Sequence, residues 1–191
     1  TARRSLNILF QEWGNRGLHF WEVGNTNVTL IQGSSTNVDA TDEGAGTYTF
    51  YRNAVDSAAA AAASPQATTV PTANVYGITD ILNIGFRQNY NTTSQSDVAL
   101  SKVDRSAYSG TANKAAVGTP SQFWVQRFID RVTVTLYPLP NAAAAAATSK
   151  LMVYYVKRIQ DVGAFSNATD TPFRFVPCMV SGLTYLLSQK F

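Results

Sequence analysis

The sequence predicts an α+β fold, in which a small helical bundle formed by the two ends of the chain carries a large antiparallel β insertion. Apolar residues recur at helical spacing near the start of the chain and again near its end. Between the two ends, apolar and polar residues alternate over several short segments bounded by glycine, proline and polar clusters. We therefore expect a discontinuous helical base of residues 1–23 and 170–191, and a β-rich insertion domain of residues 24–169.

The opening helix is predicted from five apolar residues that share one helical face: Ala2, Leu6, Leu9, Phe10 and Trp13. Gly14 and Gly17 suit the left-handed backbone that ends a helix. A connecting segment with His19, Phe20 and Trp21 follows. Because the chain starts at Thr1 already inside this pattern, we expect a further N-terminal piece ahead of it.

Short strands are predicted at residues 28–32, 47–52 and 98–100, and one or two strands at residues 75–87. Residues 33–46 have the composition of a loop, and residues 104–108 suit a single helical turn. The clearest β signal is residues 121–137. In its second half Val132, Val134 and Leu136 face one way, while polar residues face the other. Pro138 and Pro140 should end this strand, and residues 150–157 are expected to pair with it as a hairpin.

The closing helix is predicted to begin near Asp170 and Pro172, since proline suits the first turn of a helix. Its apolar residues at helical spacing are Val176, Met179, Val180, Leu183, Leu186 and Leu187. Cys178 lies on the apolar side of this helix, where we expect it to behave as a small hydrophobe.

Composition favours a subunit that buries much of its surface in an assembly. Charged residues are 14% of the 191 residues, against about 25% in an average soluble domain. The net charge of +3 is too weak to indicate a nucleic-acid binder by itself. A single cysteine excludes an intrachain disulfide, and no apolar run is long enough for a spanning helix.

Two runs of six alanines, at residues 58–63 and 142–147, lie between proline- and serine-rich flanks. Either they stand for side chains of unidentified type or they form a genuine low-complexity linker. Six residues are too few for a stable isolated helix, so no chemistry is assigned to them.

The sequence contains no catalytic or metal-binding constellation that we can identify. His19 is the only histidine, and a packed or capping role is favoured over a nucleophilic site built around it. One histidine and one cysteine leave too few ligands for a zinc site. Asp39, Asp42 and Glu43 are better explained as a solvated loop than as a calcium site. We therefore expect no enzymatic activity, no metal and no cofactor.

Pairs of basic residues suggest a surface that faces DNA through phosphate contacts only. The alternative is that they are solvated or form ion pairs. These residues are Arg3, Arg4, Lys102, Arg105, Arg127, Arg131, Lys157 and Arg158.

Seven collinear segments carry a resemblance that covers most of the chain. In order they are ARRSLNILFQEWGNRGLHFW, TDILNIGFRQN, SQSDVALSKVDRSAYSGTANK, GTPSQFWVQR, VTVTLYPLP, LMVYYVKRIQDVG and DTPFRFVPCMVSGLTYLLSQKF. Together they resemble the head-to-tail adaptor (connector, or packaged-DNA stabilisation) proteins of tailed bacteriophages. The departures are residues 34–72 and the start of the chain.

The resemblance implies a virion structural protein without catalytic residues, assembled in the host cytoplasm. It implies a ring, commonly of twelve copies, that sits below the portal protein at the head–tail junction. Such a ring extends the DNA channel, helps retain the packaged genome until ejection and presents a platform for the tail nozzle or fibres. No membrane partner is implied.

On this basis Trp13, Tyr185, Lys190 and Phe191 are candidate contacts with the portal or with neighbouring subunits, and Arg3, Arg4 and Arg16 are candidate channel-facing residues. Several aromatic residues suit subunit contacts, unless they fill the core of the monomer: Trp13, Trp21, Phe123, Trp124, Tyr154 and Tyr185. The alternatives are a β-rich, tail-associated module that binds a receptor or glycan, and a cell-wall-degrading enzyme. The helical ends argue against the first, and the scarcity of His, Cys and acidic residues argues against the second.

Overall fold

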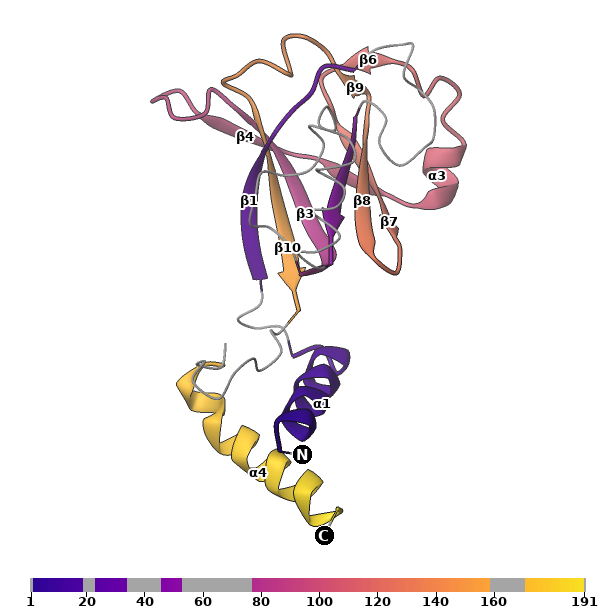
Figure 1. The fold of residues 1–191 in the computed structure, drawn as a ribbon. Helices are drawn as coiled ribbons and strands as arrows, with labels where there is room; N and C mark the ends of the chain where they lie inside the picture. The colour runs from indigo at the N-terminus through magenta and orange to yellow at the C-terminus, as the bar shows by residue number, and fades with distance from the viewer. Residues whose placement is uncertain (1, 19–22, 34–45, 53–76, 159–170, 191) are drawn as a thin grey trace, which may run out of the picture. The chain divides into compact units, whose positions relative to one another are not determined.

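The computed structural model describes residues 2–18, 23–33, 46–52, 77–158 and 171–190 (Figure 1). The fold is α+β, with helices at both ends and a largely antiparallel β region between them, as predicted. Two compact units are present: a helical unit of Thr1–Val23 with Lys157–Phe191, and a β unit of Gly24–Val156. The second boundary, expected between residues 169 and 170, falls at the end of the range 159–170, which the structure does not describe.

The helical unit consists of α1 (Ala2–Asn15), the 3-10 helix η1 (Phe173–Phe175) and α4 (Val176–Ser188). α1 ends as predicted at a glycine in the left-handed region, because Gly17 has a φ of +80° and Leu18 N–H donates to the Trp13 carbonyl at 3.1 Å. Gly14, in contrast, remains inside the helix. At the other end of the chain Pro172 precedes η1, and a second proline, Pro177, occupies the first turn of α4.

The β unit contains two four-stranded sheets (Figure 1). In spatial order, the first sheet is β1 (Val23–Thr29), β10 (Lys150–Lys157), β3 (Ile78–Gln88) and β4 (Ser96–Ala99). The second is β2 (Thr47–Tyr51), β8 (Arg131–Tyr137), β7 (Gln122–Arg127) and β5 (Ser101–Val103). A short helix, α3 (Arg105–Ser109), and a parallel pair, β6 (Val117–Gly118) with β9 (Leu139–Pro140), complete the unit.

One hydrophobic core is built from side chains of both sheets. Its largest fully buried members come from β2, β3, β7, β8 and β10: Tyr48, Phe50, Phe86, Phe123, Ile78, Ile81, Ile84, Leu136, Leu151 and Val132. The Tyr48 hydroxyl accepts a hydrogen bond from Ile31 N–H at 3.1 Å, and burial raises the pKa of Tyr48 to about 12. The β unit is thus a sheet-on-sheet structure with a continuous apolar interior.

The predicted pairing of residues 150–157 with 131–137 is wrong. β8 pairs with β2 on one side and with β7 on the other, so neither of its edges is free for β10. The hairpin partner of β8 is β7, through a turn in which Phe128 N–H donates to the Arg131 carbonyl at 2.9 Å. β10 instead lies between β1 and β3, where the Thr79 hydroxyl donates to the Val156 carbonyl at 2.9 Å.

β8 is buried on both faces, so the side opposite Val132, Val134 and Leu136 is also covered. Thr133 has no exposed surface and Thr135 is 9% exposed. Both hydroxyls have neighbours within hydrogen-bond reach, Gln126 Oε1 at 3.3 Å and Thr47 Oγ1 at 3.5 Å. A central strand can therefore bury threonine without leaving its hydroxyl unsatisfied. β8 does end before Pro138 as predicted, although Pro140 continues into β9.

The strand expected at residues 98–100 is part of a longer segment that passes from one sheet to the other. β4 pairs with β3 in an antiparallel register, and β5 pairs with β7 in a parallel register. The change occurs at Leu100, whose N–H donates to the Ile84 carbonyl, while Ser101 N–H donates to the Ser121 carbonyl, both at 2.9 Å. The two sheets are thus joined along one edge by covalent chain.

An ion pair also links the sheets, since Arg127 of β7 donates two hydrogen bonds, at 2.8 and 2.9 Å, to the Asp80 carboxylate of β3. Burial alone would raise the pKa of Asp80, but the hydrogen bonds from Arg127 and from Ile81 N–H outweigh it and lower that pKa. The depressed pKa means that the pair stabilises the fold above the ordinary value of 3.8 and that this contribution disappears as pH falls through the lowered pKa.

We expect Asp80→Asn to reduce the free energy of unfolding at pH 7 by less than about 1 kcal/mol, because the pair is partly exposed to solvent. The difference from wild type should shrink as pH falls below 3.8 and vanish below the lowered pKa of the folded Asp80 carboxylate, where wild type has lost this charge as well. Urea unfolding at a series of pH values measures both effects. A variant that differs from wild type equally at acid and neutral pH would contradict the assignment.

Candidate interaction surfaces of the helical unit

The net charge of the chain is concentrated in the helical unit. Its sequence ranges contain seven Lys and Arg against four Asp and Glu, whereas the β unit contains eight of each. The excess of +3 for the whole chain therefore belongs to the helical unit, and the β unit has no net charge.

Within the β unit, the basic side chains that were candidates for DNA contact have partners in the fold. Arg127 binds Asp80 as described above, and Arg131 binds Asp130 with an N–O distance of 2.8 Å. The Lys102 ammonium donates to the Ile81 carbonyl at 3.0 Å. Arg105, on α3, is exposed. Two of these four β-unit residues, Arg127 and Arg131, thus form ion pairs, as the alternative expected, and the net positive charge remains with the helical unit.

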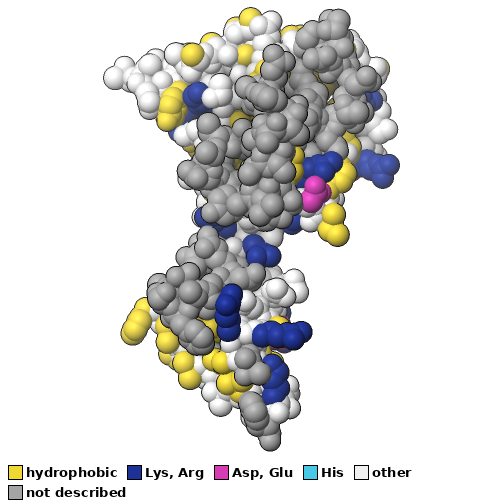
Figure 2. All heavy atoms as spheres, in the orientation of Figure 1, with side chains coloured by type: hydrophobic (Ala, Val, Ile, Leu, Met, Phe, Trp, Pro, Cys, Tyr) yellow, Lys and Arg dark blue, Asp and Glu magenta, His cyan; other side chains and the backbone are white. Residues whose placement is uncertain are grey.

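α4 is an apolar helix that is largely uncovered. Its thirteen residues include no charged side chain, and none of them is buried. Val180 is 56% exposed, Tyr185 is 64% exposed, and Phe173 in the preceding η1 is 91% exposed. Figure 2 shows hydrophobic side chains gathered over this helix, with Lys and Arg side chains on the same unit. The exposed polar side chains of α4 are the hydroxyls of Ser181, Thr184 and Ser188, and exposed apolar side chains lie beside them. A charge-free helix that exposes large apolar side chains is typical of a segment that contacts another protein surface.

The expectation for Cys178 is only half right. It lies on this apolar helix, but it is exposed, so it does not pack as a core side chain. The physical reason is that α1 is the one helix among the described residues that packs along α4, and it covers only part of the α4 surface.

The two helices approach most closely at Gly182. A Cβ atom at this position would lie 2.9 Å from both Cδ atoms of Leu9. Within α1 the rings of Phe10 and Trp13 lie 5.9 Å apart between centroids, and Trp13 also contacts Phe175 of η1 at 6.3 Å. At the open end of the pair, the Lys190 ammonium donates to the hydroxyl of the fully buried Ser5 at 2.6 Å.

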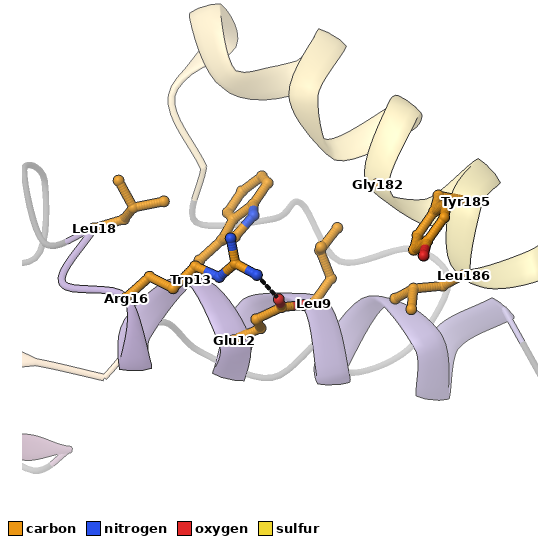
Figure 3. A pocket seen from close by; sticks show the side chains of 8 residues that line it. All are labelled: Leu9, Glu12, Trp13, Arg16, Leu18, Gly182, Tyr185 and Leu186. Atoms are coloured by element: carbon orange, nitrogen blue, oxygen red, sulfur yellow. Dashed lines mark hydrogen bonds and ion pairs between the residues drawn. The ribbon is translucent and has the colours of Figure 1, made fainter.

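A groove of about 310 Å³ lies between α1 and α4 (Figure 3). Apolar side chains make up most of its lining, and the Glu12–Arg16 ion pair, four residues apart on α1, lies at its polar side. The lining residues are Leu9, Glu12, Trp13, Arg16, Leu18, Gly182, Tyr185 and Leu186. No sequence pattern indicated this groove, although Gly182 marks a place where another helix can pack closely on α4.

The structure brings together some of the predicted site residues and separates others. Trp13 and Tyr185 line the same groove, whereas Lys190 is bound to Ser5, and Phe191 lies outside the described residues. Arg3 and Arg4 are exposed in the first turn of α1. Arg16 lies just after the end of α1, about 18 Å from Arg4 along the helix axis, and it pairs with Glu12. The three arginines therefore do not form one cluster.

The aromatic residues considered for subunit contacts also divide. Phe123 belongs to the β core, and Trp124 is half-buried and stacks on Tyr108 with a centroid distance of 4.7 Å. Tyr154, like Tyr185, is exposed, and Trp21 lies outside the described residues. Of the candidate contacts, Tyr185 and the partly covered Trp13 are the ones that the helical unit presents around its groove.

We expect Gly182→Leu to destabilise the α1–α4 pair by about 1–3 kcal/mol, because a large side chain must displace Leu9 from the contact. Gly14→Leu is the matched control, since a Cβ at Gly14 meets nothing within 4 Å and a better helix former should be neutral or stabilising there. Thermal unfolding followed by the helical circular dichroism signal compares the two variants. Equal effects at both positions would show that the close approach at Gly182 does not matter.

The described part of the chain presents no cluster of three or more His, Cys, Asp and Glu side chains suited to a metal ion. His19, Asp39, Asp42 and Glu43 lie outside it. Within the same residues, neither α1 nor α4 has the length and apolar character that crossing a membrane would need. Comparison with protein-family models, with curated proteins and with solved structures finds no match to this chain.

Proposed function

We propose that this chain is a structural subunit of a tailed-phage virion, a head-to-tail adaptor that forms a ring between the portal protein and the tail. The observation that carries the proposal is α4, a charge-free apolar helix with no buried residue. Leaving this surface in water is unfavourable by roughly 25 cal/mol for each Å² of apolar area. A permanent protein partner would remove that cost, and the resemblance of the sequence to adaptor proteins supplies the kind of partner.

The distribution of charge supports the same function. A ring of such subunits would bring together many copies of a helical unit that has a net charge of +3. Exposed arginines at the start of α1, Arg3 and Arg4, would then contribute positive potential next to the DNA channel. Contacts of this kind bind phosphates without reading base sequence, which suits a channel that must hold and later release any genome.

In this proposal the protein acts by assembly and retention rather than by catalysis. The helical unit binds the portal and the neighbouring subunits, commonly in twelve copies, and the β unit contacts the tail nozzle or fibres. The site of action is the head–tail junction of the virion, which is assembled in the host cytoplasm. No metal or cofactor takes part.

The experiment is to mix the purified chain with portal rings of the phage that encodes it and to image the particles by electron microscopy. We expect one additional protein layer on a single face of the portal ring. Binding of the chain to isolated tail or glycan receptors, together with no binding to portal rings at micromolar concentration, would instead favour the receptor-binding module.

A further inference from the structure

We propose that the groove between α1 and α4 receives the Phe173 side chain of a second copy of this chain. The inference rests on the proposed function as a self-assembling subunit and deepens it by naming the two surfaces that meet. One surface is the groove. The other is η1, which we call the knob, with Phe173 at its start.

The knob presents a large aromatic side chain on a hydrogen-bonded turn. Phe173 is 91% exposed, although aromatic side chains of this size usually contribute to a core. Phe175 N–H donates to the Pro172 carbonyl at 2.8 Å, which closes the turn around Phe173. The ring of Phe175 packs on Trp13, so the turn is held against α1. Because the backbone turn is already closed, binding need order little more than the Phe173 side chain itself, which suits an interface anchor.

The groove suits such a side chain. Its volume of about 310 Å³ exceeds that of a benzyl group, and Leu9, Trp13 and Leu186 offer it apolar contacts. At one side of the groove, Gly182 lets α4 pack directly on Leu9, since a Cβ there would lie 2.9 Å from both Leu9 Cδ atoms. Figure 3 shows Trp13 and Tyr185 at different ends of the opening, one from each helix.

Charge complementarity identifies the occupant as another copy of this chain. Arg174 is exposed directly beside Phe173. Glu12, at the groove, is the one acidic residue within the described residues of the helical unit. Its side chain is 43% exposed and pairs with Arg16, whose side chain is 71% exposed. A Phe173 that enters the groove would therefore carry Arg174 towards the Glu12 carboxylate.

The knob and the groove are different patches of one subunit, so the contact is head-to-tail. Phe173 lies in η1, 13 residues before Leu186 of α4, which corresponds to about 20 Å at 1.5 Å per residue. Because Phe173 is 91% exposed, it does not fill the groove of its own copy. Contacts between unlike patches propagate from subunit to subunit and close into a ring when the rotation permits.

Sedimentation equilibrium of the whole chain tests the inference with Phe173→Ala and, as matched control, Ile129→Ala. Ile129 is 97% exposed but lies in the turn between β7 and β8. We expect wild type and the control to self-associate alike, and Phe173→Ala to weaken association by at least about 10-fold. A wild-type chain that stays monomeric at ~1 mM, or an equal effect of both variants, would overturn the inference.

A charge exchange tests the orientation independently. Arg174→Glu and Glu12→Arg should each weaken self-association by a few-fold, and the double variant should recover most of the loss. Failure of the double variant to recover would overturn the pairing of these two residues.

Binding to portal rings separates the two proposals. If Phe173→Ala leaves self-association unchanged but abolishes portal binding, the knob contacts the portal, and the inference about a second copy is wrong while the adaptor function stands. If wild type self-associates through Phe173 but never binds portal rings, the contact stands and the adaptor function fails.

Discussion

Val180→Glu is expected to abolish incorporation of the chain into portal-bound rings while leaving the free chain folded. Val180 is 56% exposed on α4, a helix without any charged side chain. If this surface is buried on assembly, the new carboxylate must lose its water without gaining a partner. Burying an unpaired charge in an interface costs about 2–5 kcal/mol, so binding should weaken by at least about 30-fold.

The control for this prediction is Ile129→Glu, which places the same charge at a position that is 97% exposed in the β unit. We expect it to leave portal binding unchanged. Helical circular dichroism of the free Val180→Glu chain should match that of wild type. If Val180→Glu binds portal rings as tightly as wild type, the exposed face of α4 is not the assembly surface, and the observation that carries the proposed function loses its force.

Phe86→Ala should destabilise the β unit more than any other substitution considered above. Phe86 is 1% exposed and lies on β3, within the core shared by the two sheets. Removing a buried phenylalanine side chain costs about 3–5 kcal/mol, through lost transfer free energy and the cavity that remains. Since a domain of this kind is stable by only about 5–15 kcal/mol, the variant should unfold at much lower urea concentration.

Leu82→Ala is its internal control, because Leu82 belongs to the same strand but is 47% exposed. It should change the free energy of unfolding by less than about 1 kcal/mol. Urea unfolding of both variants, monitored by circular dichroism of the strands, measures the difference. Similar midpoints for the two would mean that Phe86 is not part of a tightly packed core.

Local patterns were sufficient to predict most of the helices and strands. The apolar spacing around Leu9 and Phe10 identified α1, and the alternation of Val132, Val134 and Leu136 identified β8. Such patterns work because the side-chain period of a helix or strand is set by the backbone of that segment alone. The segment at 75–87, expected as one or two strands, is the single strand β3.

Pairing between strands was predicted less well, as β10 illustrates. The sequence of β10 is equally suited to pairing with any apolar strand, and β8 was predicted as its partner because it is near in the chain. The structure shows that β2 and β7 already occupy both edges of β8. The choice therefore depended on strands that lie far away in the sequence, and no local pattern contains that information.

The candidate surfaces, like the strands, were predictable from sequence only in their local properties. The sequence by itself determined that the closing helix has no charge and that the positive charge lies in the terminal segments, because both are properties of composition along the chain. Only the tertiary structure decided which apolar residues remain exposed, that Leu9 packs on Gly182 beside a groove, and that Arg16 lies away from Arg3 and Arg4. Exposure and shape depend on which faces of two helices meet, and that is fixed by packing between segments more than 150 residues apart.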